Sequence, residues 1–215
     1  MAQPAPAAAG RGPLPTVRHL GVADYRKTWE SMKTFTGARG ESTPDELWVV
    51  EHPPVYTLGV AGRDEHLPRV DNGIPVVRTD RGGQVTYHGP GQIVVYTLLD
   101  LRRLGLTIRP LVRHLEGAVV DLLAGHGVNA VGDESRPGVY VADAKVAALG
   151  LKIRGGCSYH GLSFNVDMDL APFAAIDPCG HRGLAVTDAR RLGLTAPMDT
   201  LADALVRHLM ERLHG

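Results

Sequence analysis

Apolar residues recur at helical spacing in three stretches of the chain. The first stretch follows Asp24, the second runs from Pro110 to Gly125, and the third occupies residues 199–213. Asp and Pro are typical of helix starts, and Gly is typical of helix ends. We therefore predict three amphipathic helices. Their buried sides are formed by Tyr25, Trp29, Met32 and Phe35, by Leu111, Leu115, Val119 and Leu122, and by Leu201, Leu205, Leu209 and Leu213.

Short β-branched or alternating runs lie between these helices and end at turn residues. The predicted strands are residues 47–50, 75–78, 93–98, 138–141, 145–153 and 162–166. The segment GVYVADAKVAALGLKI predicts a hairpin that turns at residues 142–144. Strands outnumber helices and do not alternate regularly with them. This pattern favours an α+β fold, a mixed β-sheet flanked by helices, over a doubly wound α/β arrangement.

The first fifteen residues differ from the rest of the chain. They are rich in Ala, Pro and Gly and have no hydrophobic period, so they cannot bury enough apolar area to offset the entropy of ordering. We predict a disordered leader over residues 1–15 and a single domain over residues 16–215. With 215 residues and 44% hydrophobic content, the chain is long enough for a substantial core.

Charge and cysteine content narrow the classes of function. The 23 basic and 23 acidic side chains give a net charge of zero, which provides no general attraction to nucleic acid or to anionic membranes. Two cysteines are too few for a disulfide framework. We find no signal peptide and no apolar run long enough to cross a membrane. The sequence therefore predicts a soluble protein of the reducing cytoplasm.

A glycine-rich stretch, RTDRGGQVTYHGPGQ, is the most informative part of the sequence. Glycines let backbone amides approach a ligand, and polar side chains lie beside them. This composition indicates a binding loop, although a Gly-rich hairpin that only supports a surface loop would have the same composition. Neither G-x-G-x-x-G nor G-x-x-x-x-G-K is present, so a dinucleotide or triphosphate loop is not predicted.

The two cysteines occupy different surroundings. Cys179, between Pro178 and Gly180, has the loop setting of a nucleophile. Cys157 lies ahead of a predicted strand, where a free cysteine is most often a small buried side chain. A reactive thiol needs a nearby base or cation, and Lys145 is the candidate. From spacing alone, an ordinary solvated lysine at a strand end is the favoured reading of Lys145.

A zinc site is an alternative use of the same region. Cys157 and His160 form C-x-x-H, and Cys179 and His181 form C-x-H, so together they could supply four ligands. The spacings are irregular, and other histidines, such as His52 and His88, are equally available.

Four strings, RGGQVTYHGPGQ, AKVAALGLKI, SYHGLSFNV and IDPCG, occur in an order and spacing that resemble the lipoyl(octanoyl) transferase family. These are acyl-carrier-protein-dependent enzymes of lipoate biosynthesis. The likeness runs from the first predicted helix to the last. It implies a fold similar to the catalytic domain of biotin and lipoate protein ligases, with a tunnel for the acyl chain.

The resemblance implies roles for individual residues. Cys179 falls on the cysteine of the P-C-G motif, the acyl-thioester nucleophile, and Lys145 falls on the lysine before the A-x-L-G stretch. No metal is implied. The positions that fall on substrate-contacting segments are Arg81, Gly82, Gly83, Gln84, Val85, Thr86, Tyr87, His88, Ala148, Leu149, Gly150, Gly161, Leu162 and Ser163.

The resemblance also implies a two-step reaction. Octanoyl, or lipoyl, on the phosphopantetheine thiol of acyl carrier protein passes to Cys179, with Lys145 stabilising the thiolate. The target lysine of a lipoyl domain then takes the acyl group. Such domains occur on 2-oxoacid dehydrogenase acyltransferase subunits and as the glycine-cleavage H protein. Since the carrier delivers the acyl group, no cofactor is expected.

Two other functions fit parts of this pattern. An ATP-dependent lipoate or biotin ligase would share the fold, but it activates a free acid as an adenylate and needs no cysteine. A non-catalytic carrier-binding module would make Cys179 and Lys145 incidental. For carrier docking, the densest basic stretch is LRRLGLTIRPLVR, which reads equally well as a solvated connection.

Overall fold

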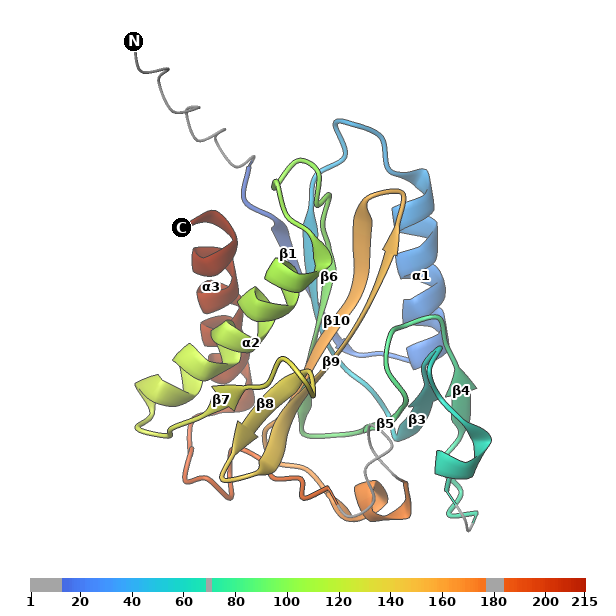
Figure 1. Ribbon diagram of the computed structural model, residues 1–215, viewed down its shortest axis with the longest axis vertical. Helices are drawn as coiled ribbons and strands as arrows, with labels where there is room; N and C mark the ends of the chain where they lie inside the picture. Colours follow the sequence, from blue (N-terminus) through green and yellow to red (C-terminus); the bar gives the residue numbers. More distant parts are fainter. Residues whose placement is uncertain (1–12, 69–70, 177–183) are drawn as a thin grey trace.

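The computed structural model describes residues 13–68, 71–176 and 184–215 (Figure 1). Within these ranges the α-helices are α1 (Tyr25–Ala38), α2 (Ile108–Gly125) and α3 (Met198–His214). Short 3₁₀ turns are η1 (Asp64–His66) and η2 (Ala171–Ala175). All three predicted helices are confirmed. The Asp24 side chain accepts a hydrogen bond of 2.9 Å from the Lys27 backbone N–H, as expected of a helix cap.

A large mixed sheet forms the centre of the described structure (Figure 1). Its strands, in spatial order, are β1 (Thr16–Val22), β2 (Glu46–Glu51), β6 (Gln92–Leu98), β10 (Cys157–Asn165), β9 (Ala144–Arg154), β8 (Gly138–Val141) and β7 (Val131–Gly132). β1 and β2 are parallel, and every other pair of neighbours in the sheet is antiparallel. A smaller sheet has the order β4 (Val76–Arg78), β3 (Val55–Leu58) and β5 (Val85–His88).

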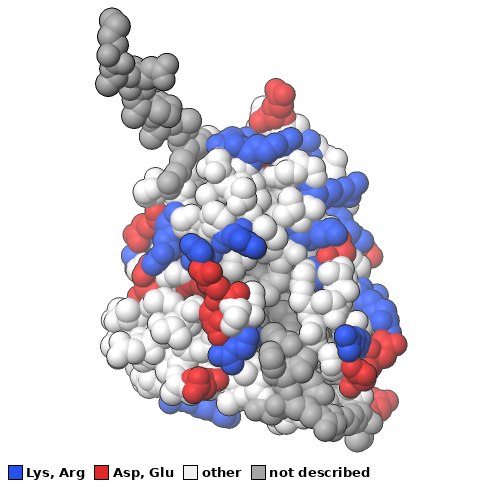
Figure 2. Space-filling model, in the orientation of Figure 1, with Lys and Arg blue, Asp and Glu red and all other residues white. Residues whose placement is uncertain are grey.

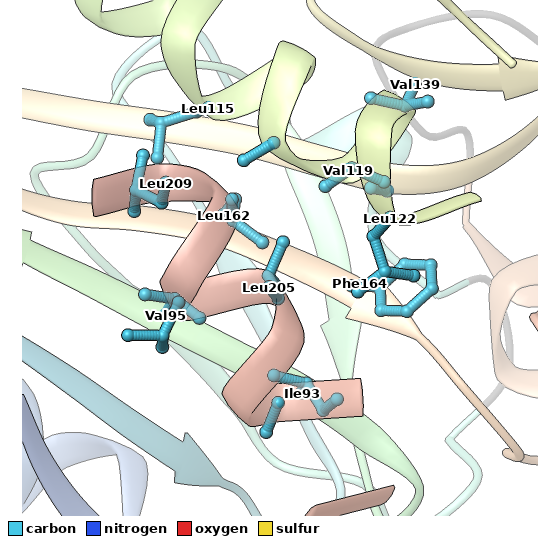
Figure 3. Packing of buried hydrophobic residues seen from close by; sticks show 14 of the residues in the cluster. Ile93, Val95, Leu115, Val119, Leu122, Val139, Leu162, Phe164, Leu205 and Leu209 are labelled. Atoms are coloured by element: carbon cyan, nitrogen blue, oxygen red, sulfur yellow. The ribbon is translucent and has the colours of Figure 1, made fainter. Parts of the chain in front are cut away.

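Helices cover both faces of the large sheet. α2 and α3 pack on one face and α1 on the other. Along β6, Ile93 and Val95 belong to the core beneath α2 and α3, whereas Val94 and Tyr96 belong to the cluster beneath α1. Because both faces of β6 are buried, its sequence reads as a continuous apolar run. Figure 3 shows the larger core, in which Leu115, Val119, Leu122, Leu205 and Leu209 of the helices pack over Ile93, Val95, Leu162 and Phe164 of the sheet.

The predicted hairpin is confirmed and joins β8 to β9. Ala142 and Asp143 at its turn both have positive φ, 46° and 68°, as a tight type I′ turn requires. The second helix begins at Ile108 rather than Pro110, which places Pro110 in its first turn, where the missing N–H has no cost. Residues 1–12 of the predicted leader lie outside the described residues, and β1 starts at Thr16.

Several strand predictions differ from the structure. β10 begins at Cys157, not at residue 162, because Ser158 and His160 are buried although they are polar. β1, β3, β5 and β7 were not predicted as strands. β1 is an edge strand with mostly exposed residues, and β7 has two residues, so neither carries an alternating apolar pattern. Within the described ranges, no helix is long and apolar enough to span a bilayer.

Candidate active site

A pocket lies on the α1 side of the large sheet. It is bounded by β9 and β10 on one side, and by β5 and the loop before β5 on the other. Figure 2 shows this face of the molecule, with a hollow near its centre. Four apolar residues, Val85, Val94, Leu149 and Leu162, contribute to its lining, although the side chains of Val85 and Leu162 are packed in neighbouring cores. The remaining lining residues are Tyr25, Arg81, Gly83, Gln84, Thr86, His88, Tyr96, Lys145, Ala147, Ala148, Gly150, His160, Gly161, Ser163, Asn165, Phe173 and Val186.

Residues 79–84 of the glycine-rich stretch form the loop between β4 and β5, and this loop packs on β9. The buried Arg81 guanidinium donates to the Thr57 carbonyl oxygen at 2.6 Å and to the carbonyl oxygen of Gln84 at 2.7 Å, so it fixes the loop. The Gly82 N–H donates to the Leu151 carbonyl oxygen at 2.8 Å. A Cβ on Gly150 would lie 2.9 Å from the Gly82 carbonyl oxygen, so close approach of the two backbones requires glycine.

Most of the predicted substrate-contacting positions line this one pocket. The exceptions are Gly82, which is hydrogen-bonded to β9, and Tyr87. The Tyr87 ring packs against Tyr56 and Phe173 in the core of the small sheet, on the other side of β5. The structure thus brings three separate sequence motifs together around one cavity. Their contact with substrate stays a prediction.

Lys145 is 4% exposed and lines the pocket, so the solvated reading favoured by spacing is wrong. The pairing of β8 with β9 shifts beside it: Val139 pairs with Ala147 but Tyr140 pairs with Lys145, which leaves one extra residue on β9. Such a bulge re-aims the side chain next to it. The Lys145 Nζ lies 3.5 Å from the Pro137 carbonyl oxygen and 5.2 Å from the centre of the Tyr140 ring.

Cys179 and His181 lie outside the described residues. The described residues on either side reach the pocket: Phe173 and Val186 both line it. The segment that follows pairs directly with β9, because the Lys145 N–H donates to the Ala185 carbonyl oxygen at 2.8 Å. The Thr187 N–H donates in turn to the Lys145 carbonyl oxygen at 3.0 Å. The chain that leaves the Cys179 segment is therefore hydrogen-bonded to the backbone of Lys145.

Cys157 and His160 do not converge on a common point. The Cys157 sulfur, buried at the start of β10, contacts Arg102 Nη2 at 4.0 Å, away from the pocket lining. This confirms Cys157 as a small buried side chain. His160 Nε2 is bound to Asp80 instead. Among the described residues, no group of three His, Cys, Asp or Glu side chains is arranged to hold a metal.

Asp80 and His160 form a pair at the pocket that sequence reasoning missed. The Asp80 carboxylate accepts hydrogen bonds from Trp29 Nε1 at 2.8 Å, from His160 Nε2 at 3.0 Å and from the Tyr159 hydroxyl. Burial works to raise the pKa of this carboxyl, but the three donors outweigh it and hold the pKa well below its usual range. His160 has a positive φ of 61° inside β10, a strained conformation for a non-glycine residue. This conformation stacks its ring on Tyr159, so both side chains reach Asp80.

A buried hydrogen-bond chain runs from His88 towards the segment beside Lys145. His88 Nδ1 donates to Gln92 Oε1 at 2.7 Å, and Gln92 Nε2 donates to Asn165 Oδ1 at 2.9 Å. Asn165 Nδ2 then donates to the Thr187 carbonyl oxygen at 3.0 Å. Burial, with smaller contributions from neighbouring charges, lowers the pKa of His88 to about 3, so the imidazole is neutral at pH 7.

The neutral His88 predicts that acid weakens the fold. In the unfolded chain a histidine binds a proton near pH 6.5, whereas the folded protein resists protonation until about pH 3. The unfolded state therefore gains protons first, and stability falls as pH drops from about 6.5. From pH 7 to pH 5, His88 alone should reduce the free energy of unfolding by about 2 kcal/mol.

Denaturant unfolding of His88→Gln at both pH values measures this contribution. The variant should lose less stability than the wild type over the same pH interval, by about 2 kcal/mol. The exposed His126, at the end of α2, supplies the control, because His126→Gln makes the same substitution outside the pocket. Equal pH dependence in wild type and His88→Gln would show that His88 is not held neutral.

The predicted basic patch is largely neutralised within the fold. Arg102 is paired with Asp100 at 2.9 Å, and Arg103 with the buried Asp45 at 2.8 Å. Arg113 is paired with Glu134. Figure 2 shows Lys and Arg side chains over the upper and right-hand margins of this face, with acidic side chains among them. Carrier docking through the patch stays a prediction.

Comparison with known proteins agrees with the resemblance. The octanoyltransferase of Nitrosospira multiformis is 60% identical over 197 residues, which cover 92% of this chain and 91% of the relative. The octanoyltransferase of Nitrosomonas europaea is 57% identical over 198 residues, which cover 92% and 97%. These relatives confirm the predicted resemblance to the lipoyl(octanoyl) transferases.

Solved structures confirm the predicted fold. A bi-partite lipoate protein ligase from Thermoplasma acidophilum has a TM-score of 0.76 at 19% identity, covering 94% of this chain and 84% of that one. Biotin protein ligase from Aquifex aeolicus has a TM-score of 0.60 at 14% identity, covering 92% and 70%. The pattern of the lipoyl protein ligase A/B catalytic domain family matches residues 24–210. The chain therefore belongs to this family, in which it is an acyltransferase related to octanoyltransferases.

Proposed function

We propose that this protein transfers an octanoyl group from acyl carrier protein to the target lysine of lipoyl domains, through a thioester on Cys179. The observation that carries the proposal is the burial of Lys145 in the pocket wall, hydrogen-bonded through its backbone to the segment that follows Cys179. A buried amine at a pocket is suited to proton transfer, because desolvation favours its neutral form. The relatives named octanoyltransferase, which are 60% and 57% identical to this chain, support octanoyl as the acyl group.

In the first step, the proton of the Cys179 thiol passes to the Lys145 amine. The thiolate attacks the carbonyl carbon of the octanoyl thioester, and the bond from that carbon to the phosphopantetheine sulfur breaks. The departing phosphopantetheine thiolate takes the proton from Lys145. The acyl group is then held as a thioester on the enzyme, beside a pocket whose lining includes the apolar residues Val94, Phe173 and Val186.

In the second step, the neutral amine of the target lysine attacks this thioester. A carbon–nitrogen bond forms, the bond to Cys179 breaks, and the proton released by the amine returns through Lys145 to the cysteine sulfur. A thioester is a more reactive acyl donor than the amide product, so the transfer needs neither ATP nor a bound cofactor. The lysine acceptors are the lipoyl domains of 2-oxoacid dehydrogenase acyltransferase subunits and the glycine-cleavage H protein. The related Thermoplasma acidophilum ligase is described together with its E2 lipoyl domain, which supports an acceptor of this class.

Transfer in the absence of ATP tests the proposal. Purified protein is mixed with octanoyl-acyl carrier protein and an apo lipoyl domain, and the mass of the lipoyl domain is followed with time. We expect one octanoyl group per lipoyl domain without ATP and no reaction when the lipoyl lysine is replaced. Transfer only from free octanoate with ATP would establish a ligase instead.

A further inference from the structure

We propose that Glu116 is a positioning residue for Lys145 and acts through the Pro137–Gly138 peptide. This inference rests on the proposed function, because it concerns the amine that handles the proton there. Glu116 lies on α2, on the opposite side of the large sheet from α1, and it is 5% exposed although it is a carboxylic acid. A buried carboxylate needs hydrogen-bond donors. The group that donates to Glu116 is therefore the group that Glu116 holds in place.

The two groups are joined by one peptide. The Gly138 N–H donates to Glu116 Oε1 at 2.9 Å, inside the protein. The carbonyl of the same peptide belongs to Pro137, and its oxygen lies 3.5 Å from Lys145 Nζ. The N–H and C=O of a peptide point in opposite directions in one plane. A carboxylate that fixes the N–H therefore also fixes the direction of the carbonyl towards the lysine.

Gly138 gives the lysine room to lie against this peptide. A Cβ at this position would be 3.0 Å from Lys145 Cε and 3.3 Å from Nζ. The same Cβ would be 2.9 Å from the Ala147 carbonyl oxygen. The φ of Gly138 is 150°, which L side chains rarely adopt. The Lys145 side chain thus occupies the space that a Cβ at residue 138 would need, so this position requires glycine.

This arrangement gives the amine a fixed acceptor in a buried setting. A carbonyl that accepts from the ammonium stabilises the protonated lysine, and a carboxylate behind the same peptide strengthens that carbonyl as an acceptor. Loss of the Glu116 acceptor leaves the Gly138 N–H buried without a partner, and the peptide is then free to rotate away from Lys145. Misplacing a reacting group by about 1 Å can cost on the order of a hundredfold in rate.

Substitutions at Glu116 separate positioning from stability. Glu116→Gln keeps an oxygen that can accept from Gly138, whereas Glu116→Ala removes it. With a small octanoyl thioester as donor, we expect Glu116→Ala to lower kcat by roughly tenfold to a hundredfold with KM within about twofold. Glu116→Gln should retain kcat within roughly threefold of the wild type. Thermal unfolding of each variant, measured alongside, shows that the assayed protein is folded.

Gly138→Ala tests the same contact without altering Glu116. It should lower kcat at least as much as Glu116→Ala, because the added Cβ meets the lysine side chain. Gly127→Ala is the matched control: its φ is also positive, 76°, but nothing lies within 4 Å of the added Cβ. Gly138→Ala also decides the question if Glu116→Ala does not fold.

The outcomes separate this inference from the proposed function. If the wild type does not transfer octanoyl, the proposed function and this inference both fail. If the wild type is active and Glu116→Ala or Gly138→Ala matches its kcat, only the role of Glu116 is overturned. A fall in kcat for Glu116→Ala that Glu116→Gln does not share supports that role.

Discussion

Replacing Cys179 with alanine is expected to abolish octanoyl transfer, with a fall in rate of at least about 10⁴-fold. The reason is that the proposed reaction has no step that bypasses the thioester. Removing the nucleophile of a covalent mechanism removes both half-reactions together. Initial rates of transfer from octanoyl-acyl carrier protein to an apo lipoyl domain measure the effect.

The other cysteine provides the control for this substitution. Cys157 is 4% exposed and contacts Arg102 rather than the pocket. Cys157→Ala removes one sulfur from the interior, so it should lower stability modestly and leave the transfer rate within a fewfold of the wild type. Activity in Cys179→Ala, or its loss in Cys157→Ala with the fold intact, would contradict the assignment of the nucleophile.

Replacing Lys145 with alanine is expected to lower the transfer rate by about 10²- to 10⁴-fold, the range typical of an acid–base group. The structure gives the physical reason, because the amine is buried at the pocket wall beside the segment that follows Cys179. Without the amine, the thiol loses its proton acceptor and the charge that stabilises the thiolate. The pH at which iodoacetamide alkylates Cys179 should therefore rise in the variant.

A lysine on the same strand controls for the removal of a lysine side chain. Lys152 lies on β9 but is not among the residues that line the pocket. Lys152→Ala should leave both the transfer rate and the alkylation profile close to those of the wild type. An alkylation profile unchanged in Lys145→Ala would separate Lys145 from the thiol and contradict the proposed pair.

The elements that the sequence predicted well are those whose pattern matches their burial. The three helices each bury one apolar side, and β6 buries both faces. The helical spacing of apolar residues and the continuous apolar run of β6 can therefore be recognised in the sequence. Strand β10 is different. It buries Ser158 and His160 along with its apolar residues. Ser158 Oγ donates to the Thr97 carbonyl oxygen and His160 Nε2 is hydrogen-bonded to Asp80, and both partners are far away in sequence. A local pattern cannot show such partners, so the predicted strand began too late.

The site was predicted from its glycines and motifs better than from its charges. The close approach of Gly150 to Gly82 explains why two distant motifs both contain glycine. The burial of Lys145 follows instead from a bulge in the pairing of β8 with β9, which no periodicity reveals. The strained backbone of His160 and its pairing with Asp80 likewise depend on tertiary contacts. Asp80 stands directly before the RGG motif, which was the one available signal for it.

The intact mass of the protein after incubation with octanoyl-acyl carrier protein, in the absence of an acceptor, tests the central claim most directly. The account predicts that the protein gains the mass of one octanoyl group, that hydroxylamine removes it as it does a thioester, and that fragmentation places it on Cys179. The gain should persist in Cys157→Ala and disappear in Cys179→Ala. Octanoyl found on Cys157, or transfer to the lipoyl domain by Cys179→Ala without any acylated enzyme, would contradict the account.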